Sequence, residues 1–118
     1  MTEIRIDVVA RGPVEVVVIA GSVDGATAPS LVAAFRQRVG EGRIRIVGDF
    51  AGVDYISSAG LRALLETVKE ARQRGGDLCL AAVQPDVRRV LDLAGFSGIL
   101  KLYANVEEAV ASFPGTGA

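Results

Sequence analysis

The sequence contains no histidine and no tryptophan, and its only cysteine is Cys79. Histidine is the commonest general base and a frequent metal ligand, so its absence argues against most hydrolytic and metal-dependent mechanisms. A single cysteine cannot form an internal disulfide or complete a zinc site, and this one stands in an apolar run typical of a protein core. We therefore expect no catalytic residue, no metal site and no cofactor.

The chain also lacks a charge excess and a long apolar run. Thirteen basic residues oppose fourteen acidic residues, and no cluster of Lys and Arg suits nucleic acid or an anionic membrane. The longest apolar runs, such as Val16 to Ala20 and Leu78 to Val83, are far shorter than the roughly 20 residues of a membrane span, and no leader is recognisable. We expect a cytoplasmic protein without membrane insertion, with proteins or small molecules as partners and no nucleic acid.

Half of the 118 residues are hydrophobic, which is enough to build the core of one domain. Their spacing predicts the order strand, strand, helix, strand, helix, strand, helix, strand, helix. The predicted strands cover residues 4–8, 14–20, 43–47, 78–83 and 99–103, and the predicted helices begin near Pro29, Ser57, Pro85 and Asn105. A loop is predicted over Gly48 to Ile56, and a flexible tail over residues 114–118 after the domain of residues 1–113.

The alternation of strands and helices after the opening hairpin favours parallel pairing, and the hairpin adds an antiparallel strand. The expected fold class is therefore α/β, a single domain with a mixed sheet of about five strands and four helices. Periodicity alone leaves open whether the helices cover one face of the sheet or both. The alternation of Ile4, Ile6 and Val8 with polar residues predicts that the first strand has one solvated face.

Two adjacent serines, Ser57 and Ser58, precede the most regular apolar stripe of the chain, which runs from Leu61 to Ala71. Serine is among the best N-cap residues, so Ser57 is a plausible cap that needs no further function. The alternative is that one hydroxyl is phosphorylated, because a helix N-terminus tolerates the added negative charge. A partner docked over that end would then meet a bulky dianion, which would make the serine a switch.

Four stretches, taken together and in this order, resemble the STAS domain, the module of sulphate transporters and anti-sigma factor antagonists. They are "GSVDGATAPSL" (21–31), "GVDYISSAGLRALL" (52–65), "RGGDLCLA" (74–81) and "PDVRRVLDLAGFSGIL" (85–100). The resemblance covers nearly the whole chain. It implies a single STAS-like domain whose four helices pack mainly on one face of the sheet.

Free-standing members of this length resemble bacterial anti-sigma factor antagonists, also called anti-anti-sigma factors, which are binding proteins and not enzymes. In that family the unphosphorylated protein binds an anti-sigma factor serine kinase and frees the sigma factor. Phosphorylation by the kinase releases the antagonist, and a PP2C-type phosphatase restores it. The resemblance thus implies partner switching in the regulation of transcription.

By register with the motif glycine, Gly60, the family's acceptor serine falls on Ser58. Well-known members have aspartate before the acceptor, where this chain has Ser57, and Ser57 is therefore kept as the alternative acceptor. The family's loop aspartate falls on Asp24. The partner-binding residues that the resemblance implies are Asp24, Ser57, Ser58, Ala59, Gly60 and Leu61.

Two other functions stay open within the same fold. Small STAS proteins also resemble accessory subunits of lipid-transport ABC systems and scaffold components of the stressosome type. Asp49 and Asp54 form no recognisable acid and base pair and are interpreted as turn or capping residues, and Arg88 with Arg89 as the solvated face of a helix. Neither the cognate sigma factor, nor nucleotide binding, nor the oligomeric state follows from the sequence.

Overall fold

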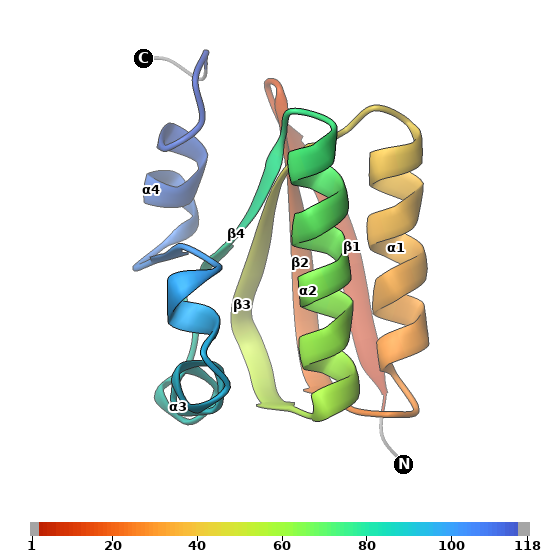
Figure 1. Cartoon of the computed structure of the whole chain (residues 1–118), viewed down its shortest axis with the longest axis vertical. Helices are drawn as coiled ribbons and strands as arrows, with labels where there is room; N and C mark the ends of the chain where they lie inside the picture. Colours follow the sequence, from red (N-terminus) through yellow and green to blue (C-terminus); the bar gives the residue numbers. More distant parts are fainter. Residues whose placement is uncertain (1–2, 116–118) are drawn as a thin grey trace.

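A computed structural model describes residues 3–115 of the chain, which form a five-stranded sheet with four α-helices (Figure 1). The elements are β1 (Ile4–Arg11), β2 (Val14–Val23), α1 (Ala28–Gly40), β3 (Arg45–Ile56), α2 (Ser58–Gln73), β4 (Asp77–Ala81), α3 (Pro85–Leu93), β5 (Leu102–Tyr103) and α4 (Val106–Ala111), with a short 3₁₀ helix (Phe96–Gly98) before β5. This order confirms the predicted succession of strands and helices.

The strands lie in the order β1-β2-β3-β4-β5, with β1 antiparallel to β2 and every other pair parallel. The mixed sheet of five strands is therefore confirmed. Its first strand has the expected solvated side, since Ile4 and Ile6 are partly buried and Arg5 and Asp7 are exposed. In residues 3–115 no helix is long and apolar enough to cross a membrane.

Most of the core lies between one face of the sheet and three helices, α1, α2 and α3. Successive strand residues point to opposite faces, so Val17 and Ile46 pack against these helices while their neighbours Val16 and Val47 face the other way. The second face is covered by α4, whose Ala109 packs against it. The helices thus lie mainly on one face, as expected, with α4 as the exception.

The predicted loop over Gly48 to Ile56 was wrong, because these residues continue β3 alongside β2. Two glycines and two aspartates suggested turns. In the structure, Gly48 and Gly52 lie where a Cβ atom would stand 2.9 Å from Leu80 Cδ2 and 2.8 Å from Ala20 Cβ. The strand needs glycine there because neighbouring strands leave no room for a side chain.

The end of the chain partly matches the prediction. The last helix begins after Asn105, whose side chain accepts a hydrogen bond from the Glu108 amide at 2.9 Å, as the capping spacing predicted. This helix ends at Ala111, slightly before the expected limit at Phe113. Of the predicted flexible tail, Pro114 and Gly115 are exposed, and residues 116–118 lie outside the described residues.

Candidate functional site

The two segments singled out by sequence meet at the edge of the sheet where β2 and β3 end. The backbone amide of Ser57 donates a hydrogen bond to the carbonyl of Val23 at 2.8 Å. This bond ties the start of α2 directly to the loop that leads from β2 into α1. The N-termini of α1 and α2 therefore lie side by side at one end of the molecule (Figure 1).

Ser57 is the N-cap of α2, as predicted. Its backbone is extended, and its hydroxyl oxygen accepts a hydrogen bond from the amide of Gly60 at 3.4 Å. The side chain is partly buried. This hydroxyl satisfies one of the amides that the first turn of a helix leaves without a helical partner.

Replacement of Ser57 by alanine should therefore lower the free energy of unfolding by about 1 kcal/mol. The measurement is urea denaturation followed by circular dichroism. Ser58→Ala is the matched control, since it removes a hydroxyl one residue away that caps nothing, and it should stay within about 0.5 kcal/mol of the parent. Equal losses in both variants would contradict the assignment of Ser57 as the cap.

Ser58 occupies the first helical position and is exposed. Its hydroxyl makes no hydrogen bond with any residue in the range 3–115. The first turn of α2 carries no acidic side chain, so the positive end of the helix dipole is not neutralised there. The structure thus separates the two serines: one hydroxyl holds the helix end, and the other is directed to the surface without a structural task.

Asp24 has a structural role in the loop between β2 and α1. Its Oδ1 atom accepts hydrogen bonds from the amides of Ala26 and Thr27, at 2.9 and 3.0 Å. The hydroxyl of Thr27 accepts from the amide of Asp24 and donates to the carbonyl of Ser22 at 2.6 Å. The carboxylate therefore fixes the turn that starts α1, and any contact it makes with a partner would come from this fixed position.

The remaining predicted contact residues differ in accessibility. Gly60 is buried, and a Cβ atom there would lie 2.7 Å from Val23 Cγ1 and from Ile56 Cγ1. Leu61 and Ala59 are partly buried and pack against the main core. Gly60 thus contributes close packing of α2 on the sheet rather than a side chain on the surface, whereas Ala59 and Leu61 keep part of their surface exposed.

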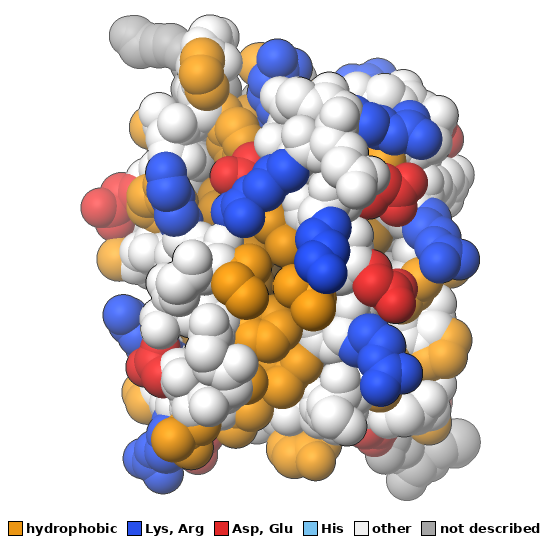
Figure 2. All heavy atoms as spheres, viewed as in Figure 1, with side chains coloured by type: hydrophobic (Ala, Val, Ile, Leu, Met, Phe, Trp, Pro, Cys, Tyr) orange, Lys and Arg blue, Asp and Glu red, His pale blue; other side chains and the backbone are white. Residues whose placement is uncertain are grey.

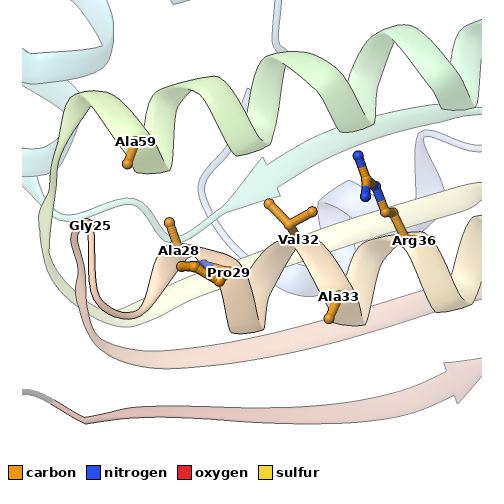
Figure 3. Close-up of a pocket in the computed structure, with 7 residues that line it drawn as sticks. All are labelled: Gly25, Ala28, Pro29, Val32, Ala33, Arg36 and Ala59. Carbon is orange, nitrogen blue, oxygen red and sulfur yellow. The ribbon is translucent and has the colours of Figure 1, made fainter.

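A groove between α1 and α2 begins beside Ser58, and sequence reasoning missed it (Figure 3). Its volume is about 490 Å³, and it is lined by Gly25, Ala28, Pro29, Val32, Ala33, Arg36 and Ala59. Six of these seven residues are small or apolar, and only Arg36 carries a charge. The available signal was a partly buried Val32 and an exposed Ala33 on a helix whose core positions are Leu31, Phe35 and Val39.

The side chains of Asp49, Asp54 and Cys79 have structural roles. Asp49 accepts a hydrogen bond from the amide of Ala51 at 3.1 Å, and Asp54 accepts one from the hydroxyl of Ser22 at 2.8 Å. Burial raises the pKa of the Cys79 thiol to about 12, aided by the nearby charge of Asp77, so this thiol stays protonated at neutral pH. In the described part of the chain, no group of His, Cys, Asp and Glu could hold a metal ion.

The fold and the site define an α/β domain whose distinctive surface is a helix N-terminus beside an apolar groove, features of a binding domain. Residues 5–109 match the family model described as the STAS domain, and the chain belongs to this family. A protein of Bordetella bronchiseptica named as a candidate anti-sigma factor antagonist, BtrV, is 41% identical over 93 residues, which cover 79% of this chain and 80% of the relative.

Solved structures agree with the family assignment. An anti-sigma factor antagonist from Mycobacterium paratuberculosis superposes with a TM-score of 0.86 at 28% identity, over 93% of each chain. The antagonist SpoIIAA has the same fold in its unphosphorylated form, with a TM-score of 0.77 at 22% identity over 93% of this chain and 95% of the other. Its phosphorylated form gives 0.70 at 21% identity over 93% and 98%.

Proposed function

We propose that this chain is a cytoplasmic anti-sigma factor antagonist controlled by phosphorylation of Ser58. In its unphosphorylated form it binds an anti-sigma factor that is also a serine kinase, and this releases a sigma factor for transcription. Phosphorylation of Ser58 ends the complex, and a PP2C-type phosphatase restores the binding form. The chain itself acts by binding and supplies no catalytic group.

One observation carries the choice of acceptor: the Ser58 hydroxyl is exposed and has no hydrogen-bond partner among the described residues, while the Ser57 hydroxyl caps the helix. A kinase can therefore reach Ser58 without first breaking a structural bond. Modification of Ser57 would remove the cap and place a dianion on a partly buried side chain. The register implied by the STAS motif and the local geometry favour the same residue.

The surroundings of Ser58 also allow the modified protein to stay folded. A phosphate of roughly −1.5 to −2 charges at a helix N-terminus interacts favourably with the free amides and the helix dipole. Arg62 lies four residues further along α2, on the same side of the helix, and makes no ion pair within residues 3–115. The switch would thus act on the partner surface and leave the fold intact.

The names of relatives support the regulatory role, and two solved structures of one neighbour, SpoIIAA, support the switch. BtrV and the protein from Mycobacterium paratuberculosis carry the designation of anti-sigma factor antagonist. SpoIIAA, which has the same fold, carries that designation and has been solved both with and without its phosphate. A protein that adopts this fold in both states is what a partner switch requires.

Mass spectrometry of the protein purified from its native host is the test of the acceptor. We expect a single phosphate on Ser58 that phosphatase treatment removes, and no phosphate in the Ser58→Ala variant. A phosphate on Ser57 alone would retain the switch and correct the acceptor. Absence of phosphate under every growth condition, together with failure of a purified kinase anti-sigma factor to modify the chain, would overturn the proposal.

A further inference from the structure

The groove between α1 and α2 continues the candidate site onto a helix that the sequence motifs do not include. Ala59, the residue after Ser58, forms one wall, and the side chains of Ala28 and Val32 face it from α1 (Figure 3). In Figure 3 the side chain of Val32 points toward α2, across the space between the two helices. The lining of the groove that begins beside the proposed phosphorylation site is therefore apolar apart from Arg36, whereas Figure 2 shows Lys, Arg, Asp and Glu side chains over the outer surface of the two helices.

Arg36 lies at the far end of this groove and has no charged partner in the described part of the chain. It is exposed, and its side chain points toward α2 (Figure 3). By contrast, Arg38, two residues later, contacts Glu15 at 3.4 Å and Glu41 at 3.7 Å. The cation at the end of the groove is thus available to a group from outside the molecule.

We propose that this groove binds a segment of the anti-sigma factor that presents apolar side chains followed by a carboxylate for Arg36. The inference rests on the proposed function. It extends the surface that contacts the anti-sigma factor from the N-terminus of α2 to the side of α2 that faces α1. From Ala28 to Arg36 the helix rises by about 12 Å, or roughly two turns. The segment should therefore place its carboxylate about 12 Å from the apolar side chain that sits nearest Ser58.

The chemistry of the lining selects a protein segment as the occupant. Small-molecule sites combine an apolar lining with several polar groups that converge on the ligand. Here Arg36 is the single polar side chain of the lining, and the small side chains of Ala28 and Ala59 leave room between the two helices. Such a surface suits an amphipathic segment that inserts apolar side chains along a groove.

This placement also explains how a phosphate on Ser58 could disrupt a complex whose apolar contacts lie elsewhere. Ser58 directly precedes Ala59 in the groove wall, so a partner seated in the groove covers the end of α2. A dianion at that point would be enclosed with the apolar segment of the partner. Without a compensating cation from the partner, the enclosed charge is strongly unfavourable.

The test uses two groove variants and two matched controls, with the purified anti-sigma factor that phosphorylates the wild-type chain as the probe. Val32→Trp fills the groove from the side chain that points across it, and Ser30→Trp places the same side chain at an exposed position of α1 outside the groove. Arg36→Gln removes the charge at the groove end. Arg89→Gln removes an exposed charge from α3, away from the groove.

Binding is measured by calorimetry on the full chain, and the thermal midpoint of each variant confirms that it is folded. We expect Val32→Trp to weaken binding at least about tenfold, because a filled groove excludes the apolar side chains. Arg36→Gln should weaken binding about threefold to tenfold and reduce its salt dependence. Both controls should bind like the wild type.

The outcomes separate the two proposals. If the wild-type chain binds no anti-sigma factor, the proposed function fails, and the groove assignment is overturned with it. If the wild type binds and Ser58→Asp does not, while both groove variants bind normally, the proposed function stands and the groove assignment is overturned. Equal losses in Val32→Trp and Ser30→Trp would also overturn it, since the effect would then not come from the groove.

Discussion

A chain carrying Ser58→Asp is expected to bind the anti-sigma factor on the order of 100- to 10,000-fold more weakly than the wild type. The physical reason is that the carboxylate places a charge at the exposed end of α2, where the partner would exclude water. A buried charge without a partner costs roughly 3 to 5 kcal/mol, which corresponds to this loss of affinity. Calorimetry with the purified anti-sigma factor measures the effect.

Ser58→Ala is the matched variant, and the opposite behaviour is expected from it. It should bind as tightly as the unmodified wild type and continue to bind when the kinase is supplied with ATP. The wild-type complex should dissociate under those conditions. Equal affinities for the aspartate and alanine variants would show that negative charge at this position does not control binding, and the switch would have to be abandoned.

Gly60→Ala is expected to lower the stability of the domain markedly. The added Cβ atom would lie 2.7 Å from Val23 Cγ1 and 2.7 Å from Ile56 Cγ1, closer than carbon atoms approach in folded proteins. Either α2 moves away from the sheet or two core side chains leave their preferred positions. Overpacking of this kind costs typically 1 to 3 kcal/mol, which lowers Tm by on the order of 5 to 15 °C.

Gly40→Ala provides the control for this substitution. Gly40 is the last residue of α1, it is exposed, and a Cβ atom there meets nothing within 4 Å. Alanine also favours helix over glycine, so this variant should equal the wild type or exceed it by up to about 1 kcal/mol. A thermal scan in which both variants unfold at the wild-type temperature would contradict the close packing of α2 on β2 and β3.

Gly60 also connects stability with the site. The glycine sets how closely the first turn of α2 approaches Val23, and Val23 accepts the hydrogen bond from the Ser57 amide. Displacement of the helix would move Ser58 relative to the loop that Asp24 holds in place. The motif glycine is therefore explained by close packing of the backbone, whereas Ser58, two residues before it, is explained by its exposure.

Most of the local structure followed from the sequence because the relevant forces act between neighbouring residues. The 3.6-residue spacing of Leu64, Val68 and Ala71 predicted α2, and all three are buried. Ser57 and Asn105 were predicted to cap helices, and both side chains accept the expected backbone amide. Capping and amphipathic periodicity depend on a few adjacent residues, so no tertiary information was required.

The second half of β3 could not be predicted for the opposite reason. Its glycines and aspartates have the local preferences of a turn, and its extended shape comes from pairing with β2 and from close packing against Ala20 and Leu80. At two places in its pairing with β2, β3 also carries an extra residue, which removes the simple alternation that identifies a strand. Long-range contacts overrode local preference there.

The sequence by itself determined the class of fold, the order of the elements, the position of α2 and the candidate pair of serines, since patterns and motifs are linear. Only the tertiary structure distinguished the two hydroxyls, because it placed one on the Gly60 amide and left the other exposed. It alone placed Ala59 of α2 opposite α1, so that the two helices form a groove that ends at Arg36. These residues are separated along the chain, and only the packing of two helices on one sheet makes them neighbours.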